Sequence, residues 1–195
     1  GDFERLKEAF VAFVHRLPFY GLAVLCIDDP HVAAIVPSLA RPALTYGFSS
    51  EATIRAESVI VDGRETRFRV ERGEAGPPID VALALPGRHN VLNALAAIAV
   101  ATDEGVSDDA IKQGLAEYAG VGRRFEVAEP VRIAGADVTL VDDYGHHPTE
   151  VAAVLETVRA AWPGRRAVTV YQPHRYTRTR DLYDDFTRVL SATDV

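Results

Sequence analysis

One ten-residue segment of the chain is unusually dense in ionisable side chains. Residues 141–150 read Val-Asp-Asp-Tyr-Gly-His-His-Pro-Thr-Glu, so two neighbouring carboxylates, a phenol and two imidazoles lie in one short stretch. An apolar strand-like run precedes the segment, and an apolar helical run, residues 151–162, follows it. Because α/β enzymes place their chemistry where a strand turns into a helix, the segment is a candidate catalytic loop. The simpler alternative is a helix start, with His147 as the N-cap before Pro148 and no chemistry.

A second polar segment, residues 172–180, follows another apolar run, residues 167–171. If that run is a buried strand parallel to the first, both polar segments lie at the same edge of one sheet. The second segment contains His174, Arg175 and Arg178, and arginines three residues apart suit forked hydrogen bonds to a carboxylate or a phosphate. Taken alone, a charge run of this kind is usually a solvated surface loop.

Two further segments carry groups that suit a nucleotide. Asn90 and Asn93 lie on one face of an expected helix, and their carboxamides can read the edge of a purine. His89 lies beside them, although Asn90 could equally serve only as a helix cap. Residues 122–126, Gly-Arg-Arg-Phe-Glu, offer two guanidinium groups for a phosphate, a weak signal by itself.

Two other classes of protein have to be weighed. His146, His147, His174, Asp142 and Asp143 have the donor types of a zinc hydrolase, but their spacing matches no standard ligand pattern. A nucleic-acid-binding module needs a basic surface, whereas the formal net charge here is -7. We therefore expect neither nucleic acid nor a membrane among the partners.

Composition indicates an ordinary globular protein. Of the 195 residues, 48% are hydrophobic and 25% are charged. A single cysteine, Cys26, excludes an internal disulfide and fits a reducing compartment, so we expect a cytoplasmic protein. No apolar run approaches the roughly 20 residues of a membrane span. The chain lacks methionine and begins at Gly1, which indicates a piece cut from a longer protein.

Hydrophobic periodicity predicts an α/β fold. The expected helices cover residues 3–16, 30–40, 90–102, 107–118, 148–162 and 181–190, and the expected buried strands cover 22–27, 43–48 and 167–171. A small antiparallel sheet is expected from residues 52–61, 66–70 and 79–85, and a hairpin turning at Gly135 from residues 127–133 and 136–141. The order of elements after this hairpin's first strand predicts a right-handed βαβ unit and the start of a parallel sheet.

Taken in order, these segments resemble the Mur ligases, the ATP-dependent amino-acid ligases of peptidoglycan synthesis. The resemblance is carried by the motifs PGRHNVLNALAA, GRRFE, VDDYGHHPTEV and YQPHRYTRTRDL. The last two are the specific ones, and they look most like the member that joins L-alanine to UDP-N-acetylmuramate. The resemblance implies that residues 1–123 are the C-terminal half of the central ATPase domain, and that residues 124–195 begin a Rossmann-like C-terminal domain.

The resemblance also implies a reaction and a set of site residues. ATP and magnesium activate the muramyl carboxylate as an acyl phosphate, which the amine of L-alanine attacks. Asn90 and Asn93, with His89 beside them, resemble the adenine contacts, and Asp143 resembles the ribose contact. Arg124 resembles the arginine near the terminal phosphate of the nucleotide.

The same resemblance places a second group of residues around the alanine and the muramyl carboxylate. In it the arginines hold the carboxylate of alanine and leave its amine free. Arg124 and His146 are the expected catalytic residues, and the substrate contacts are Tyr144, His146, His174, Arg175 and Arg178.

Parts of the family pattern are absent from this sequence: the Gly-Lys-Thr phosphate loop, the acidic residue that binds magnesium with it, and the UDP-binding domain. We therefore expect the magnesium ligands to lie mostly outside the chain, and the chain alone to be inactive. Two alternative functions are a murein-peptide ligase of cell-wall recycling and a nucleotide-binding module without catalysis.

Overall fold

The computed structural model describes residues 2–194 and divides into two compact units, which are described separately. The first comprises Gly1–Ile60, Thr66–Leu83 and His89–Glu117, and the second comprises Val61–Glu65, Ala84–Arg88 and Tyr118–Val195. The expected domain limits, 1–123 and 124–195, stay a prediction. Within residues 2–194, no helix combines the length and the apolar character needed to cross a membrane.

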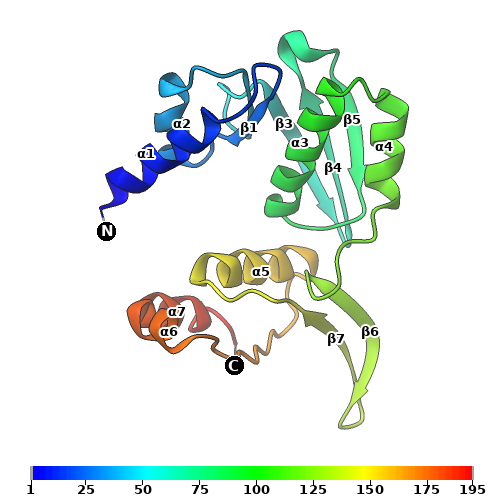
Figure 1. Cartoon of the computed structure of the whole chain (residues 1–195). Coiled ribbons are helices and arrows are strands. Elements are labelled where there is room, and N and C mark those ends of the chain that lie inside the picture. Colours follow the sequence, from blue (N-terminus) through cyan, green and yellow to red (C-terminus); the bar gives the residue numbers. More distant parts are fainter. Residues whose placement is uncertain (1, 195) are drawn as a thin grey trace. The chain divides into compact units, whose positions relative to one another are not determined.

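The first unit is built on one mixed sheet of five strands in the order β1-β2-β3-β4-β5. β1 pairs with β2, and β2 with β3, in parallel, whereas β4 and β5 are antiparallel (Figure 1). The strands are β1 Ala23–Cys26, β2 Ala43–Gly47, β3 Ile54–Asp62, β4 Glu65–Glu71 and β5 Ile79–Leu83. The predicted α/β class is confirmed. The three strands expected to form a separate small antiparallel sheet are β3, β4 and β5. They instead belong to the same sheet as the parallel strands β1 and β2.

Helices α1 (Phe3–Val14), α2 (Pro30–Ile35), α3 (Arg88–Asp103) and α4 (Asp108–Glu117) complete this unit. α3 lies across the β3–β5 part of the sheet (Figure 1) and buries Val91, Leu95 and Ile98 completely. These residues recur at the spacing of one helix face, which is why the Ala-rich segment folds there. α2 is shorter than predicted because Pro37 cannot continue an α-helix, and a 3-10 turn, Val36–Ser38, follows it.

The second unit consists of a hairpin and helices. The hairpin strands β6 and β7 are antiparallel, and Ala134 and Gly135 turn between them with φ of 49° and 85°, as the glycine predicted. The elements are β6 Glu126–Ile133, β7 Ala136–Asp142, α5 Pro148–Ala161, α6 Tyr176–Asp181 and α7 Tyr183–Leu190.

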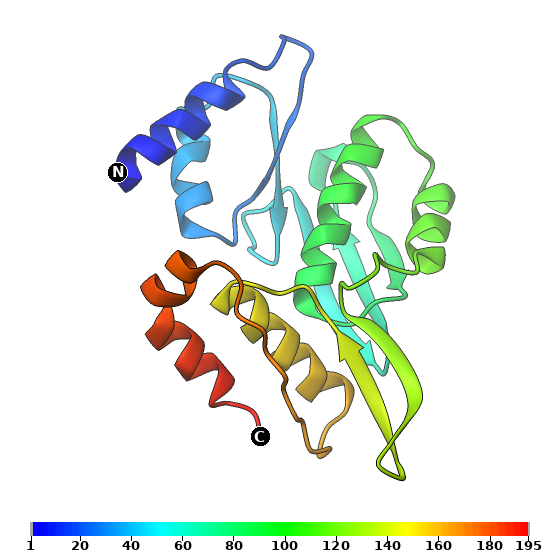
Figure 2. The same ribbon diagram turned by 60° about the horizontal axis from the view of Figure 1, so that its bottom comes forward.

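The prediction of a buried strand over residues 167–171 is wrong. These residues form no strand, and Val168 and Val170 are 60% and 95% exposed. The segment instead runs as extended chain beside α5 (Figures 1 and 2). A segment forms a strand only when its backbone hydrogen-bonds to a neighbouring strand. Within residues 2–194, β7 pairs with β6 and not with residues 167–171. The predicted βαβ unit and parallel sheet are therefore not formed in this unit, and part of the expected polar loop is helical, in α6.

A buried arginine ties the loop between β4 and β5 to α4 and, through a hydrogen bond to Thr102 Oγ1 at 3.4 Å, to α3. Arg72 is 3% exposed, and its Nε donates to the carbonyl oxygen of Pro77 at 2.7 Å. Its Nη1 and Nη2 each lie 2.8 Å from a carboxylate oxygen of Asp108, at the start of α4. The hydrogen bond from Arg72 holds the pKa of Asp108 below its ordinary value, although desolvation opposes this shift.

We expect Arg72→Ala to lower the free energy of unfolding of the first unit by roughly 2–3 kcal/mol, because the packing of the buried Arg72 side chain and its hydrogen bonds to Pro77 and Asp108 are lost. Arg69→Ala is the matched control: Arg69 is 42% exposed and pairs with Glu71 on the surface, so its loss should change little. Chemical denaturation of both variants measures the difference. Equal losses would contradict the assignment.

The Arg72–Asp108 pair also predicts a pH dependence. The folded pKa of Asp108 lies below the unfolded value of 3.8, so the stabilisation is fully present above that value. It is lost as the pH falls through the folded pKa. The difference in stability between wild type and Arg72→Ala should therefore shrink only under acidic conditions, and a difference that shrank on the alkaline side instead would contradict the pairing.

Candidate functional site

The carboxylate of Asp143 joins two loops of the second unit. Its Oδ1 accepts from the Gly145 N–H at 2.6 Å, and its Oδ2 accepts from the Phe125 N–H at 2.8 Å. The Tyr144 N–H donates to the carbonyl of Arg123 at 2.7 Å. Segment 122–126 and segment 141–150, both candidates from the sequence, are thereby fixed side by side.

The first of these loops has an uncommon backbone. Arg123 and Phe125 have φ of 58° and 51°, in the left-handed region that side chains other than glycine rarely adopt. Phe125 is 3% exposed, and its ring stacks on that of Trp162 with centroids 6.3 Å apart. The buried ring and the hydrogen bond to Asp143 hold this conformation, which leaves Arg124 between them on the exposed side.

Above these backbone contacts, a guanidinium and two rings form a partly exposed row. The Arg123 guanidinium lies 5.1 Å from the centroid of the Tyr144 ring, which suits a cation–π contact. The Tyr144 and His146 rings meet edge to face, with centroids 5.3 Å apart. Arg123 also reaches Asp142, with Nε to Oδ2 at 3.6 Å.

Helix α5 begins with a capping box, and the backbone N–H groups of His146 and His147 both take part in its hydrogen bonds. His147 is the N-cap, as predicted, and its Nδ1 accepts from the Thr149 N–H at 3.3 Å. Glu150 Oε2 accepts from the N–H groups of His146 and His147 at 2.8 and 3.1 Å. Burial tends to raise the pKa of Glu150, but these two donors, together with the charges of His146 and Arg124, leave that pKa below its usual value.

Arg178 on α6 brings the second polar segment to this loop. Its Nη1 donates to the carbonyl of His146 at 3.4 Å. The hydrogen bonds of the described residues link neither His174 nor Arg175 to the loop, and both side chains are exposed. Arg175 has a φ of 70° immediately before α6, which is a strained conformation for a non-glycine residue.

The adenine candidates belong to the first unit. His89, Asn90 and Asn93 lie in the first two turns of α3; the first two are half-buried and Asn93 is exposed. The second unit brings together Arg124, Asp143, Tyr144, His146 and Arg178. The roles given to all these residues stay predictions.

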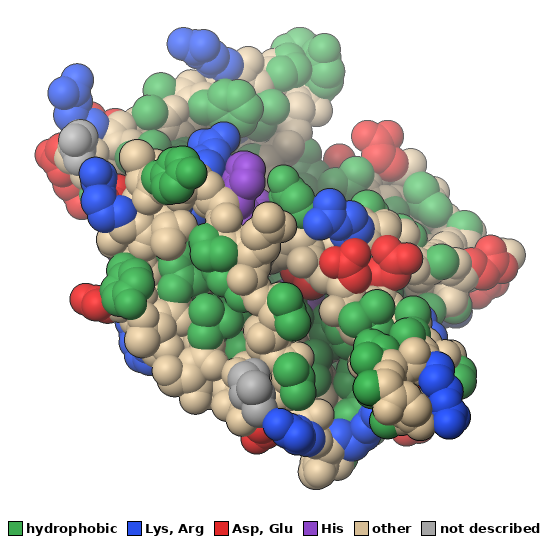
Figure 3. All heavy atoms as spheres, turned by 90° about the horizontal axis from the view of Figure 1, so that it is seen from below, with side chains coloured by type: hydrophobic (Ala, Val, Ile, Leu, Met, Phe, Trp, Pro, Cys, Tyr) green, Lys and Arg blue, Asp and Glu red, His purple; other side chains and the backbone are tan. Residues whose placement is uncertain are grey.

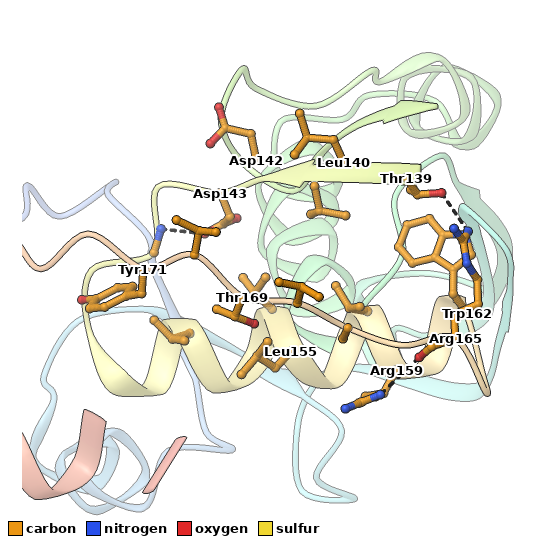
Figure 4. Close-up of a pocket in the computed structure, with 18 of the residues that line it drawn as sticks. Thr139, Leu140, Asp142, Asp143, Leu155, Arg159, Trp162, Arg165, Thr169 and Tyr171 are labelled. Atoms are coloured by element: carbon orange, nitrogen blue, oxygen red, sulfur yellow. Dashed lines mark hydrogen bonds between the residues drawn. The ribbon is translucent and has the colours of Figure 1, made fainter. Parts of the chain in front are cut away.

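A groove of about 450 Å³ runs along this unit between β7, α5 and the extended chain 165–171 (Figure 4). Asp143 and Tyr171 lie toward one end of it, and Trp162 lies toward the other (Figure 4). Among the described residues, the Tyr171 hydroxyl is the buried side-chain polar atom without a hydrogen-bond partner. Burial raises the pKa of this phenol, Arg178 opposes the shift, and Glu150 adds to it.

Sequence reasoning missed the parts that Glu150 and Phe125 play in this site. For Glu150 a signal was present, because a glutamate at the third helical position marks a capping box. For Phe125 there was no such signal, since its contact with Trp162 joins residues far apart in the chain.

No group of three or more His, Cys, Asp or Glu side chains among residues 2–194 is placed to hold a metal ion. Figure 3 shows basic and acidic side chains interspersed on one face of the molecule.

Two models of one protein family match the chain: the Mur ligase middle domain over residues 1–101, and the Mur ligase, glutamate ligase domain over residues 123–195. The solved UDP-N-acetylmuramate-alanine ligase of Thermotoga maritima is 26% identical over 100% of this chain, with a TM-score of 0.77. A murein peptide ligase of Psychrobacter arcticus is 25% identical over 88% of it, with a TM-score of 0.62. The MurF ligase of Thermotoga maritima, solved with ADP, shares the fold at 20% identity over 98% and a TM-score of 0.74. The chain spans 40%, 35% and 43% of these three proteins.

We expect Asp143→Ala to release both loops, because the Phe125 and Gly145 amides lose a charged acceptor worth roughly 1.5 kcal/mol each. The protection of these two amides against hydrogen exchange should then fall about tenfold. Asp142→Ala removes a neighbouring carboxylate that makes only a surface ion pair with Arg123, and it should leave both amides protected. Loss of protection in both variants, or in neither, would contradict the role given to Asp143.

Proposed function

Because the chain belongs to the Mur ligase family, we propose that it is part of an ATP-dependent ligase that joins L-alanine to UDP-N-acetylmuramate. The observation that carries the proposal is the clustered loop of residues 141–150 with Arg178, in a chain 26% identical over its full length to an alanine ligase. The reaction makes an amide of peptidoglycan from an acyl phosphate and an amine. It is a reaction of the cytoplasm.

The chemistry of the candidate residues supports a nucleotide. Asn90 and Asn93 offer donors and acceptors to adenine, with His89 beside them. In the second unit, each Asp143 oxygen keeps a further lone pair for ribose hydroxyls, because each accepts one N–H in the fold. Arg124 would face the terminal phosphate, where a fixed cation stabilises charge. Bound ATP supplies the phosphoryl group. Among residues 2–194, no group of three or more His, Cys, Asp or Glu side chains is placed to hold the magnesium ion that accompanies ATP.

The other candidates supply the groups that an amino acid requires. Arg178 is half-buried and held against the loop, so its position is fixed before any ligand arrives. Arg175 and His174 are exposed on the adjoining segment. The two arginines would hold the alanine carboxylate, while Tyr144 and His146 face the amine and the acyl group.

A second candidate is a murein-peptide ligase, favoured by 25% identity over 88% of the chain to such an enzyme. The two functions differ in the amine substrate and share the nucleotide chemistry. A module that only binds nucleotide remains the non-catalytic alternative.

The function is tested in a full-length ligase that contains this chain. With ATP and UDP-N-acetylmuramate present, L-alanine should release one phosphate per amide formed, measured by coupled phosphate assay and mass spectrometry. Turnover with a free murein peptide and not with L-alanine would replace the first candidate by the second. Nucleotide binding without turnover would leave only the non-catalytic module. Residues 1–195 alone should give no product.

In the same full-length protein, Arg175→Ala should raise the KM for L-alanine by roughly 10–100-fold, because a forked, charged hydrogen bond is lost. The KM for ATP should change by less than about twofold. Arg180→Ala is the matched control, since Arg180 is exposed and pairs with its neighbour Asp181. Equal effects of Arg175→Ala on the two KM values would reject its role.

A further inference from the structure

Glu150 is a partly buried carboxylate beside His146, and it has no chemical task in the proposed function. Its Oε2 accepts from the N–H of His146 at 2.8 Å and lies 3.5 Å from that residue's ring Nδ1. The same oxygen accepts from the N–H of His147 at 3.1 Å. One carboxylate oxygen therefore fixes the backbone of the candidate loop and also faces its imidazole.

The hydrogen bonds assign opposite tautomers to the two neighbouring histidines. His146 Nδ1 lies 3.1 Å from the carbonyl oxygen of Tyr144, which can only accept, so Nδ1 must carry the proton. The neutral His146 ring then has its lone pair on Nε2. His147 has the reverse arrangement, because its Nδ1 accepts from the Thr149 N–H at 3.3 Å and the ring proton lies on Nε2.

The charges around His146 suit a ring that gains a proton. The carboxylate of Glu150 faces the Nδ1 side of the ring and would stabilise the imidazolium. An orienting carboxylate does the same in the carboxylate–histidine pairs of other enzymes. The Arg178 guanidinium contacts the His146 carbonyl, and the Tyr144 ring meets the imidazole edge to face. The charge of Arg124 acts on Glu150, and together with the two backbone donors it keeps the carboxylate ionised.

We propose that Glu150 is a positioning residue that holds His146 with Nε2 as the proton acceptor for the amine of the incoming amino acid. The proposal rests on the proposed ligase function. In the step, the ammonium group of the amino acid gives one proton to Nε2, and the freed lone pair forms the C–N bond to the acyl carbon. The bond from that carbon to the phosphate oxygen breaks, and the phosphate leaves with the electron pair and the second amine proton.

The tautomers are tested on the 195-residue chain by two-dimensional NMR of the histidine ring nitrogens, at a pH about two units above the ordinary histidine range. We expect wild-type His146 to be protonated on Nδ1 and His147 on Nε2. Glu150→Gln keeps an oxygen acceptor for both N–H groups and should preserve this pattern. Glu150→Ala removes the acceptor that fixes the His146 and His147 N–H groups, so the loop no longer holds the His146 ring against the Tyr144 carbonyl and the ring should lose its preference for Nδ1. A wild-type His146 protonated on Nε2, or an unchanged pattern in Glu150→Ala, would overturn the proposal.

The functional part is tested in the full-length ligase. Glu150→Gln should lower kcat roughly 10–100-fold and leave the KM values for ATP and the amino acid within about twofold. Glu156→Gln removes the same charge from an exposed position of α5 and should match wild type in kcat and in both KM values. An unchanged kcat in Glu150→Gln would overturn the proposal.

The two experiments separate this proposal from the function on which it rests. Nδ1 protonation of His146 that depends on residue 150, in a ligase that does not use L-alanine, would support the positioning and overturn the proposed substrate. Turnover of L-alanine with the opposite tautomer would support the function and overturn the positioning.

Discussion

The candidate site depends on the two hydrogen bonds that the Asp143 carboxylate accepts from backbone N–H groups. One of them closes the turn at Gly145, and the other reaches Phe125 in a loop that precedes β6. Bonds to a charged acceptor are the stronger kind, and here they secure a backbone with two non-glycine residues in the left-handed region. The positions of Arg124 and of the Tyr144 ring follow from this contact, because each side chain leaves a backbone that Asp143 fixes.

The start of α5 links the chemistry of the loop to the folding of the helix. A capping box normally satisfies the free N–H groups of a first turn. In this chain the capping side chains are a histidine and a glutamate, so the same contacts set a ring tautomer and place a negative charge beside His146. A carboxylate is also favoured at this end by the helix dipole. The local stability of the helix and the readiness of the loop for proton transfer thus rest on one side chain.

The second unit brings its two polar segments together without a parallel sheet. The extended chain 165–171 lies along the groove beside α5, and Val170, which borders the groove, is 95% exposed. Arg178 still reaches the His146 carbonyl, because α6 carries it back toward the loop. The second polar segment therefore contacts the loop 141–150, as the sequence suggested. Helix α6 makes this contact possible, whereas two parallel strands were expected to do so.

The sequence alone determined the features that depend on near neighbours. Helix and strand periodicity, the turn at Gly135, the cap at His147 and the crowded loop 141–150 all arise from contacts a few residues apart, so their types and spacing were sufficient. Two results needed the tertiary structure. The five strands of the first unit join in one mixed sheet, and residues 167–171 form none, because strand pairing depends on a partner distant in the chain. The same holds for Asp143 and Phe125, which lie 18 positions apart, and whose hydrogen bond the order of residues does not reveal.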